Sequence, residues 1–424
     1  MTHVTVIGAG ITGVTTAYAL LDRGCDVTLL DRNRYGAMET SFANGGQLSA
    51  CNAEVWNSFA TMLKGLKWMF RSDAPLLLNP SPSWHKYSWM AEFASAVRGY
   101  RANTIETTRL AIAARKALFE MAEREKIEFD LEKRGILHVY RDEKSFRAAG
   151  SVNALLTEGG LDRRAVTPTE MRSIEPALSG EFFGGYFTPS DSTGDIHKFT
   201  RGLLEACIRR GAHFLAEANV DKITHTPSGI ETTFTQSGLT EILRADSIVI
   251  CAGIASRRFA AMLGDRINVY PVKGYSITVP LEDAISREAA PYVSLLDESA
   301  KIVTSRLGNR FRVAGTAEFN GENRDIRADR IRPLVAWTQK MFPAIETDKT
   351  IPWAGLRPMM PDMMPRVKPG SRPGVFYNTG HGHLGWTLSA ATAQMIADQV
   401  ARPTGTQFAS KVSAMIETRE TEPV

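Results

Sequence analysis

The sequence predicts an α/β protein of two domains, one with a parallel β-sheet and one with a mixed or antiparallel sheet. Three observations support this prediction. Near the amino terminus, a glycine-rich turn joins a short apolar strand to a helix, and a second apolar strand follows. Much later, Asp246–Gly253 (DSIVICAG) forms another apolar strand that ends in small residues. The stretch 267–318 alternates between apolar and polar residues, which is typical of a sheet with one buried face.

The composition is that of an ordinary globular protein. Of 424 residues, 43% are apolar and 23% charged, which excludes a disordered or fibrous chain. The net charge of +4 is small for a nucleic-acid binder, so we expect no nucleic-acid partner. Four separated cysteines without a CxxC pair argue against a metal site and a disulfide framework. With no leader-like start and no apolar run of about 18 residues, we expect a cytoplasmic protein.

The first thirty residues have the order strand, glycine-rich turn, helix, strand. Residues 3–7 are the expected first strand, Val14–Asp22 the helix, and Cys25–Leu30 the second strand. Asp31 ends that strand, 23 residues after Gly8, where a carboxylate can accept hydrogen bonds from both ribose hydroxyls of an adenosine. We assign the adjacent Arg32 to the same adenosine side. An acid here disfavours a 2′-phosphate, and therefore NADP.

The turn itself is G-x-G-x-x-G. Gly8 permits the tight bend, Gly10 lets the backbone approach a pyrophosphate, and Gly13 lets the helix pack closely on the strand. Ile11 and Thr12 complete the helix start, which directs N–H groups at the phosphates. These features predict a Rossmann-type dinucleotide-binding domain. The alternative is a glycine-rich turn in an unrelated α/β domain.

Three later segments favour FAD over NAD as the dinucleotide. Residues 36–52 form a small-residue loop, GAMETSFANGGQLSACN, in place of the next βαβ unit. Gly374–Tyr377 reads as a strand, the glycine-rich turn Asn378–Gly385 follows, and a helix then runs to about Val400, so that its positive end faces the turn. The third segment is the strand Asp246–Gly253 described above. We predict further FAD contacts in these segments and at two positions outside them, Val220 and Arg357. Within the segments they are Thr40, Ser41, Asn44, Gly45, Gly46, Gln47, Leu48, Ala252, Gly253, Gly382, Leu384, Gly385, Trp386 and Thr387.

Four motifs carry a family resemblance. ETSFANGGQLS, YPVKGYSIT, WAGLRPMMPD and NTGHGHLGWTLS follow the glycine-rich turn in that order. Together they resemble the bacterial D-amino acid dehydrogenase small-subunit family, within the glycine oxidase and D-amino acid oxidase group of flavoproteins. The resemblance implies non-covalent FAD and oxidative deamination of a D-amino acid to a 2-oxo acid and ammonia, by hydride transfer from Cα to flavin N5. It further implies that electrons pass to a respiratory acceptor such as a quinone.

The chain departs from this family in one turn. The family has PDG-x-P-x-x-G after its LRP motif, whereas this chain reads Pro361-Asp362-Met363-Met364-Pro365-Arg366-Val367-Lys368. Both expected glycines are missing, so we expect the turn beside the flavin, and the substrate pocket with it, to differ.

The resemblance also points to catalytic candidates. Arg357, in the GLRP motif, offers two parallel N–H groups to the substrate carboxylate; the alternative is a salt-bridge arginine. Tyr275 can contribute a hydroxyl to the substrate, although a tyrosine in an alternating strand is more often a core residue. Lys273 is a candidate for a place near the flavin or at the pocket mouth. His381 and His383 flank Gly382 in the flavin turn, and with no third ligand nearby they predict no metal site.

The chain is expected to cross between the two domains more than once. We predict an FAD-binding domain of 1–55, 186–255 and 350–424, and a substrate domain of 56–185 and 256–349, with an aromatic and basic insert at 54–101. Residues 55–70 can form a helix with apolar and basic sides, which fits either packing on the protein body or peripheral contact with the inner face of the cell membrane. A homo-oligomer is a further open prediction.

Three functional alternatives remain at this point. A D-hydroxyproline or other cyclic imino acid dehydrogenase differs from the leading prediction only in its pocket lining. An amino acid oxidase passes electrons to oxygen. A nicotinamide enzyme, or a nucleotide-binding module without catalysis, lacks the flavin altogether.

Overall fold

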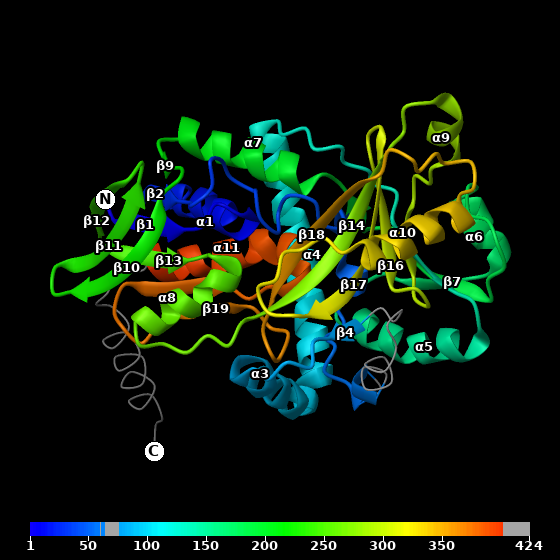
Figure 1. Cartoon of the computed structure of the whole chain (residues 1–424), viewed down its shortest axis with the longest axis horizontal. Coiled ribbons are helices and arrows are strands. Elements are labelled where there is room, and N and C mark those ends of the chain that lie inside the picture. Colours follow the sequence, from blue (N-terminus) through cyan, green and yellow to red (C-terminus); the bar gives the residue numbers. More distant parts are fainter. Residues whose placement is uncertain (60, 64–75, 402–424) are drawn as a thin grey trace, which may run out of the picture.

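The computed structural model describes residues 1–59, 61–63 and 76–401. Two halves lie side by side along the longest axis, each built around its own sheet (Figure 1). The long helix α4 (Tyr100–Glu125) lies where the halves meet and packs on helices of the first half and on α5 (Glu143–Glu158).

The first half contains a mainly parallel sheet whose strands read as almost continuous apolar runs. The spatial order is β19-β20-β13-β1-β2-β9, and every pair is parallel except β19 with β20. Its strands are β1 (His3–Ile7), β2 (Asp26–Leu30), β9 (His213–Leu215), β13 (Ser247–Ile250), β19 (Arg366–Pro369) and β20 (Val375–Thr379).

Helices cover this sheet, and a small antiparallel sheet adjoins it. The covering helices are α1 (Ile11–Leu21), α7 (Ile196–Arg209), α8 (Ser256–Met262) and α11 (Gly385–Ala401). The small sheet has the strands β10 (Asn219–Thr226), β11 (Gly229–Gln236) and β12 (Leu239–Ala245). The predicted strand at 3–7, helix after the glycine turn, second strand and carboxy-terminal helix are all present, which confirms the predicted fold class for this half.

The second half is a mixed sheet of nine strands in the order β18-β14-β17-β16-β15-β5-β7-β6, with β4 paired to β17. Its strands are β4 (Leu76–Leu78), β5 (Ile136–Tyr140), β6 (Arg164–Val166), β7 (Gly184–Thr188), β14 (Tyr270–Pro280), β15 (Ser294–Asp297), β16 (Ile302–Leu307), β17 (Arg310–Phe319) and β18 (Ile351–Met359). One face packs on α10 (Ala328–Met341) through a core that includes Ile277, Val313 and Leu334. The other face looks towards the first half.

Three shorter helices and two short strands complete the described chain. They are α3 (Trp84–Ser95), α6 (Pro168–Ile174), α9 (Ala284–Ala289), β3 (Gln47–Leu48) and β8 (Ser192–Thr193). Helix α6 begins with a capping box, in which Thr167 and Glu170 satisfy each other's backbone N–H groups.

The domain boundaries stay a prediction, with one observation bearing on them. Residues 351–359 fall in the range expected for the FAD-binding domain, yet as β18 they pair with β14 in the second sheet. The chain therefore returns to the first sheet only at β19.

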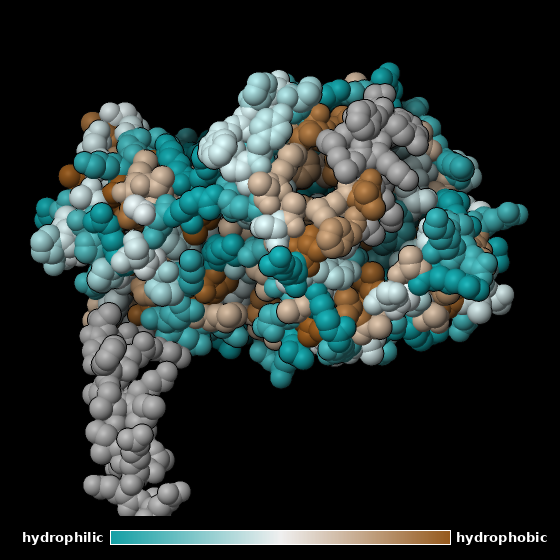
Figure 2. Space-filling view, turned by 90° about the horizontal axis from the view of Figure 1, so that it is seen from below, coloured by the Kyte–Doolittle hydropathy of each residue, from teal (hydrophilic) through white to brown (hydrophobic). Residues whose placement is uncertain are grey.

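The insert at 54–101 is described only in part. Residues 60 and 64–70 of the amphipathic helix expected at 55–70, and residues 71–75 after it, lie outside the described residues. Of the rest, Phe59, Leu63 and Trp84 are exposed large apolar side chains, and tan and brown residues gather in the centre of the face seen from below (Figure 2). No helix among residues 1–59, 61–63 and 76–401 is both long and apolar enough to cross a bilayer.

Candidate active site

A single cavity of about 780 Å³ extends between the two halves. Most of the predicted site residues line it. They are Gly8, Gly10, Ile11, Thr12, Asp31, Arg32, Thr40, Ser41, Asn44, Gly45, Gln47, Val220, Ala252, Gly253, Tyr275, Arg357, His381, Gly382, His383, Gly385 and Trp386. The remaining five, Gly13, Gly46, Leu48, Leu384 and Thr387, are not among the lining residues and lie behind this surface.

The glycine turn forms one end of the cavity. Gly8 has φ +102°, and a Cβ on Gly13 would lie 1.7 Å from the Gly8 carbonyl oxygen, so only glycine fits there. The first turn of α1 contains no acidic residue, and the Ser41 hydroxyl accepts a hydrogen bond from the Ile11 N–H at 3.0 Å. This helix terminus has the geometry that binds a pyrophosphate.

Asp31 lies at the end of β2, beside this turn. Its Oδ2 accepts a hydrogen bond from the Ala9 N–H at 2.7 Å, and its Oδ1 accepts one from the Asn33 N–H at 2.8 Å. Burial raises the pKa of the Asp31 carboxyl, although these hydrogen bonds act to lower it. The carboxylate is therefore held in a fixed orientation while it lines the cavity, as a ribose acceptor needs. Arg32 instead forms an ion pair with Glu39 at 2.6 Å.

The small-residue loop is fastened to the second sheet by its own backbone. The Ser305 hydroxyl donates to the Gly45 carbonyl at 2.7 Å, Arg312 donates to the Asn44 carbonyl at 2.9 Å, and Ser276 donates to the Ala43 carbonyl at 2.8 Å. These bonds hold the loop across the junction of the halves, where it forms the middle of the cavity wall.

Three buried polar atoms test whether the cavity suits a polar planar ligand. Trp386 Nε1, His383 Nδ1 and Thr316 Oγ1 have no hydrogen-bond partner among the described residues, and all three residues are among those that line the cavity. Buried polar groups are normally paired, so these atoms fit contacts to a bound ligand. The glycine cradle, the oriented Asp31 and these atoms fit a flavin dinucleotide.

Arg357 occupies a position prepared by a glycine on the neighbouring strand. A Cβ on Gly274 of β14 would lie 2.3 Å from Arg357 Nη2, so the guanidinium lies over the space that Gly274 leaves open. Among the described residues it has no carboxylate partner, and burial lowers its pKa to about 10. The alternative of a salt-bridge arginine therefore finds no support in the described chain.

A β-bulge in β17 holds this guanidinium. Tyr275 pairs with Gly315 and Lys273 with Glu318, so Thr316 and Ala317 together oppose the single residue Gly274. Thr316 has φ +63°, which is rare for a β-branched residue, and its carbonyl accepts a hydrogen bond from Arg357 Nη1 at 2.9 Å. The bulge thus orients the arginine, and the rest of its donors remain for a carboxylate.

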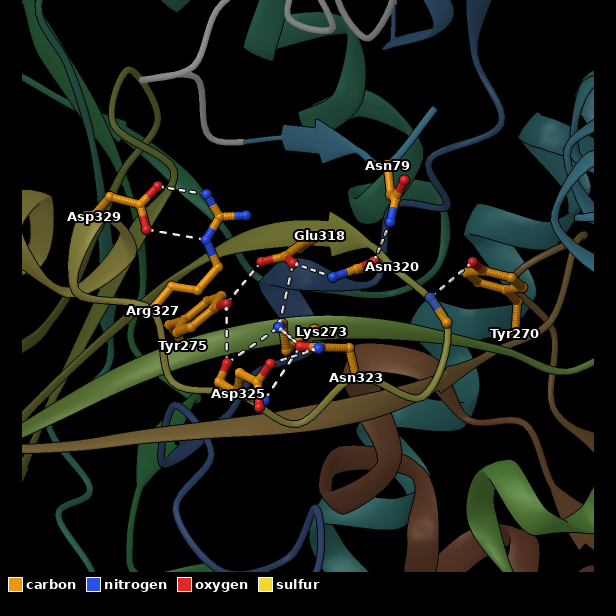
Figure 3. A network of polar contacts seen from close by, with 11 residues as sticks. Asn79, Tyr270, Lys273, Tyr275, Glu318, Asn320, Asn323, Asp325, Arg327 and Asp329 are labelled. Atoms are coloured by element: carbon orange, nitrogen blue, oxygen red, sulfur yellow. Dashed lines mark hydrogen bonds and ion pairs between the residues drawn. The ribbon is translucent and has the colours of Figure 1, made fainter. Parts of the chain in front are cut away.

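The expected role of Tyr275 does not agree with its orientation. Successive residues of a strand point to opposite faces, and Tyr275 points away from Gly274 towards α10. Its hydroxyl donates to Glu318 Oε2 at 2.7 Å, and Lys273 on the same face lies 3.2 Å from Glu318 Oε1 (Figure 3). Tyr275 therefore reaches the cavity with its backbone only, and the Lys273 ammonium is turned away from the flavin turn as well.

The two histidines of the flavin turn differ in their surroundings. His381 Nε2 lies 3.0 Å from the Thr392 hydroxyl of α11, and burial lowers its pKa to about 3. His383 stacks on Trp56 with ring centroids 4.8 Å apart, its Nε2 lies 3.1 Å from the Asn52 carbonyl, and burial lowers its pKa to about 4. Both rings are neutral at physiological pH. His383, with its free Nδ1, is the one suited to contact a ligand.

The turn without its expected glycines keeps a glycine-like backbone. Met363 stands where the family has the first glycine, and its φ is +64°. Its side chain is buried against Val55, Trp89 and Met359, and this packing offsets the backbone strain. Met363 thus adopts at this position a backbone conformation that favours glycine.

A second polar region lies at the far end of the cavity, and no sequence motif predicted it. It is formed by Glu54, Tyr100, His138, Glu298 and Lys301. His138 Nδ1 lies 3.3 Å from Glu298 Oε1, and Glu298 also pairs with Lys301. These residues come from separate segments, so no motif joins them. The described residues contain no group of three or more His, Cys, Asp or Glu side chains that could hold a metal ion.

Comparison with known proteins agrees with this geometry. The chain matches the family described as FAD dependent oxidoreductase over residues 3–399. It is 65% identical to D-amino acid dehydrogenase 3 of Mesorhizobium japonicum, over 95% of this chain and 97% of that protein. It is 40% identical to the D-amino acid dehydrogenase of Paramagnetospirillum magneticum, over 94% of each.

Solved structures share the fold at low identity. Glycine oxidase from Geobacillus kaustophilus superposes with a TM-score of 0.71 at 21% identity, over 96% of both chains. L-alpha-glycerophosphate oxidase from Mycoplasma pneumoniae, with FAD bound, gives a TM-score of 0.71 at 17% identity, over 95% of this chain and 96% of that one. The cofactor is FAD, and the chain belongs to the FAD dependent oxidoreductase family, among its D-amino acid dehydrogenases.

Proposed function

We propose that the chain catalyses the oxidative deamination of a D-amino acid to a 2-oxo acid and ammonia, with the substrate carboxylate bound by Arg357. The observation that carries the proposal is the buried guanidinium, which has a carbonyl and no carboxylate among its described partners. A buried arginine in this state favours a ligand carboxylate, because a bidentate pair restores the electrostatic stabilisation lost on burial.

The protein's own groups would position the substrate. The Thr316 carbonyl fixes one edge of the Arg357 guanidinium, so the carboxylate meets the remaining N–H groups in one orientation. Trp353 folds over Gly355, since a Cβ there would lie 2.1 Å from the indole, and forms an apolar wall beside the guanidinium. When bound, FAD supplies the acceptor for the hydride that leaves Cα.

Neutral histidines are consistent with this chemistry. Burial keeps His381 and His383 uncharged, so neither repels the substrate ammonium on its way into the site. The free Nδ1 of His383 can accept a hydrogen bond from the substrate amine.

The electron acceptor and the assembly state belong to the same proposal. We expect electrons to pass to a quinone or another respiratory acceptor, which requires peripheral contact with the inner face of the cell membrane. The exposed Phe59, Leu63 and Trp84 of the 54–101 insert support such a contact. A homo-oligomer remains an expectation.

The test is anaerobic mixing of the purified holoenzyme with D- and L-amino acids, glycine, and D- and L-proline derivatives, followed by flavin absorbance. Bleaching by D-amino acids alone is the expected result, and fast bleaching only by cyclic imino acids would favour that sibling activity. Air is then admitted: slow reoxidation supports a dehydrogenase, and fast reoxidation an oxidase. A protein that carries no flavin after reconstitution with FAD would contradict the proposal.

A further inference from the structure

The face of the second sheet that lines the cavity is ordered in rows. Ser276, Ala314, Val303, Leu296 and His138 are consecutive cross-strand partners from β14 to β5, and all five line the cavity. This row forms a floor of mostly small and apolar side chains.

A second row runs beside the first, two residues along each strand. It contains Gly274 of β14, Thr316 of β17 and Tyr140 of β5, together with Lys301 and Glu298 of the turn that joins β15 to β16, and all five line the cavity. The Arg357 guanidinium lies over Gly274 at one end of this row. Because neighbouring strands lie about 4.8 Å apart, β16 is about 10 Å and β15 about 14 Å from β14, and the turn with Lys301 and Glu298 joins these two strands.

A substrate held by its carboxylate at Arg357 can therefore reach a polar region only with a long side chain. The side chain of alanine ends over the floor. An unbranched chain with a terminal polar group extends to the region of Glu298 and Lys301, whose charges act on Glu54.

The charges in this region decide which terminal group fits. Burial favours a raised pKa for Glu298, but Lys301 and His138 outweigh it and hold the pKa well below its usual range. Burial lowers the pKa of His138 to about 4, so this ring is neutral. Glu298 and Lys301 thus satisfy each other and leave no charge for a ligand.

Two further charged groups face the same space. Arg163 donates to Asn153 Oδ1 at 3.2 Å and lies 4.6 Å from the centroid of the Tyr186 ring. Glu54 accepts a hydrogen bond from the Tyr100 hydroxyl at 2.7 Å and has no ion-pair partner among the described residues. Burial raises the pKa of Glu54, and a cation bound beside it would lower this pKa again.

We propose that Glu54 and Tyr100 form the side-chain subsite for a long D-amino acid that ends in a cation, an ammonium or a guanidinium group. The inference deepens the proposed function and rests on it. The Tyr100 hydroxyl fixes one carboxylate oxygen, and the other is left to accept the ligand's N–H groups.

The test compares D-arginine with D-citrulline, which has the same length and no charge. Flavin reduction is measured anaerobically with wild-type holoenzyme and with Glu54→Gln. We expect wild type to reduce with D-arginine at least about tenfold more efficiently, in kcat/KM, and Glu54→Gln to lose this preference through KM. Glu92→Gln, at an exposed ion pair with Arg266, is the control and should keep the preference.

The different substrates show which of the two proposals fails. D-alanine reports on the proposed function alone: if no D-amino acid reduces the flavin, both proposals fall. If D-alanine reacts and wild type does not prefer D-arginine to D-citrulline, only the subsite is refuted. A preference for D-glutamate would refute it too, because Lys301 or Arg163 would then be the group that binds the side chain. The wild-type comparison decides even if Glu54→Gln yields no folded protein.

Discussion

The two faces of β14 carry cations in opposite states of pairing: a fully buried lysine and a half-buried arginine. On one face, Lys273 lies 3.2 Å from Glu318, donates to Asn323 at 2.6 Å, and is completely shielded from solvent (Figure 3). On the other, the Arg357 guanidinium lies over Gly274 and donates to the Thr316 carbonyl. Lys273 thus has a carboxylate partner, so its network is closed. The Arg357 guanidinium has further N–H groups besides the one that binds the Thr316 carbonyl. The difference teaches that burial alone does not mark a binding site, and that incomplete pairing of a buried charge does.

The network of Lys273, Tyr275 and Glu318 supports the position of Arg357 on the other face of the sheet. Glu318 follows the bulge directly, and its contacts with Lys273 and Tyr275 hold β17 to β14 at that point. The bulge in turn presents the Thr316 carbonyl to Arg357. The position of Arg357, the proposed carboxylate-binding residue, thus depends on a network on the opposite face of the sheet.

The largest effect, on the free energy of unfolding, is expected when Lys273 loses its carboxylate partner Glu318. Glu318→Gln leaves the Lys273 ammonium buried without a counter-charge, which typically costs about 3–5 kcal/mol of the free energy of unfolding. Urea unfolding of the holoprotein measures it. Asp329→Asn, at an exposed ion pair with Arg327 in the same network, should cost less than about 1 kcal/mol. Equal losses in the two variants would show that the buried pair is not special.

A smaller effect, on kcat/KM, is expected when the space under the Arg357 guanidinium is filled. In Gly274→Ala the added methyl group would lie 2.3 Å from Arg357 Nη2, so the guanidinium must move. Displacements of this size cost about 100-fold in kcat/KM, and we expect the loss without a change in bound FAD. Ile277→Val, in the core on the opposite face of β14, should leave KM unaltered and lower the free energy of unfolding by about 1 kcal/mol. Normal kcat/KM in Gly274→Ala would mean that the guanidinium is not where the substrate binds.

The smallest effect is expected at Tyr275. Tyr275→Phe removes the hydrogen bond to the Glu318 carboxylate, which contributes about 1.5 kcal/mol to stability. Because the hydroxyl faces away from the cavity, KM for a D-amino acid should not change. A tenfold rise in KM, at normal stability, would restore the substrate role that the sequence suggests.

The dinucleotide end of the site could be predicted because its residues are close in sequence. Gly8, Gly10, Gly13 and Asp31 belong to one strand–turn–helix–strand unit, and each has a local steric or electrostatic reason to be there. The fold class followed from the same unit and from the apolar strands that return to it.

The substrate end could be predicted only in part. The GLRP motif made Arg357 a candidate, and this role stays a prediction. The face on which Tyr275 lies depends on strand register, and the bulge at Thr316 is not visible in the sequence. Gly274 was the one available signal, since a glycine within a strand often marks the close approach of another group. The region around Glu54 and Lys301 is assembled from segments far apart in the chain, so only the folded sheet brings it together.

The central claim is that one cavity holds FAD and, at Arg357, the carboxylate of a D-amino acid. It is tested most directly by anaerobic stopped-flow reduction of wild-type and Arg357→Ala holoenzymes over a range of D-alanine concentrations. We predict that Kd, taken from the saturation of the reduction rate, rises about 100-fold in the variant while the spectrum of the bound flavin stays the same. An unchanged Kd would contradict the claim.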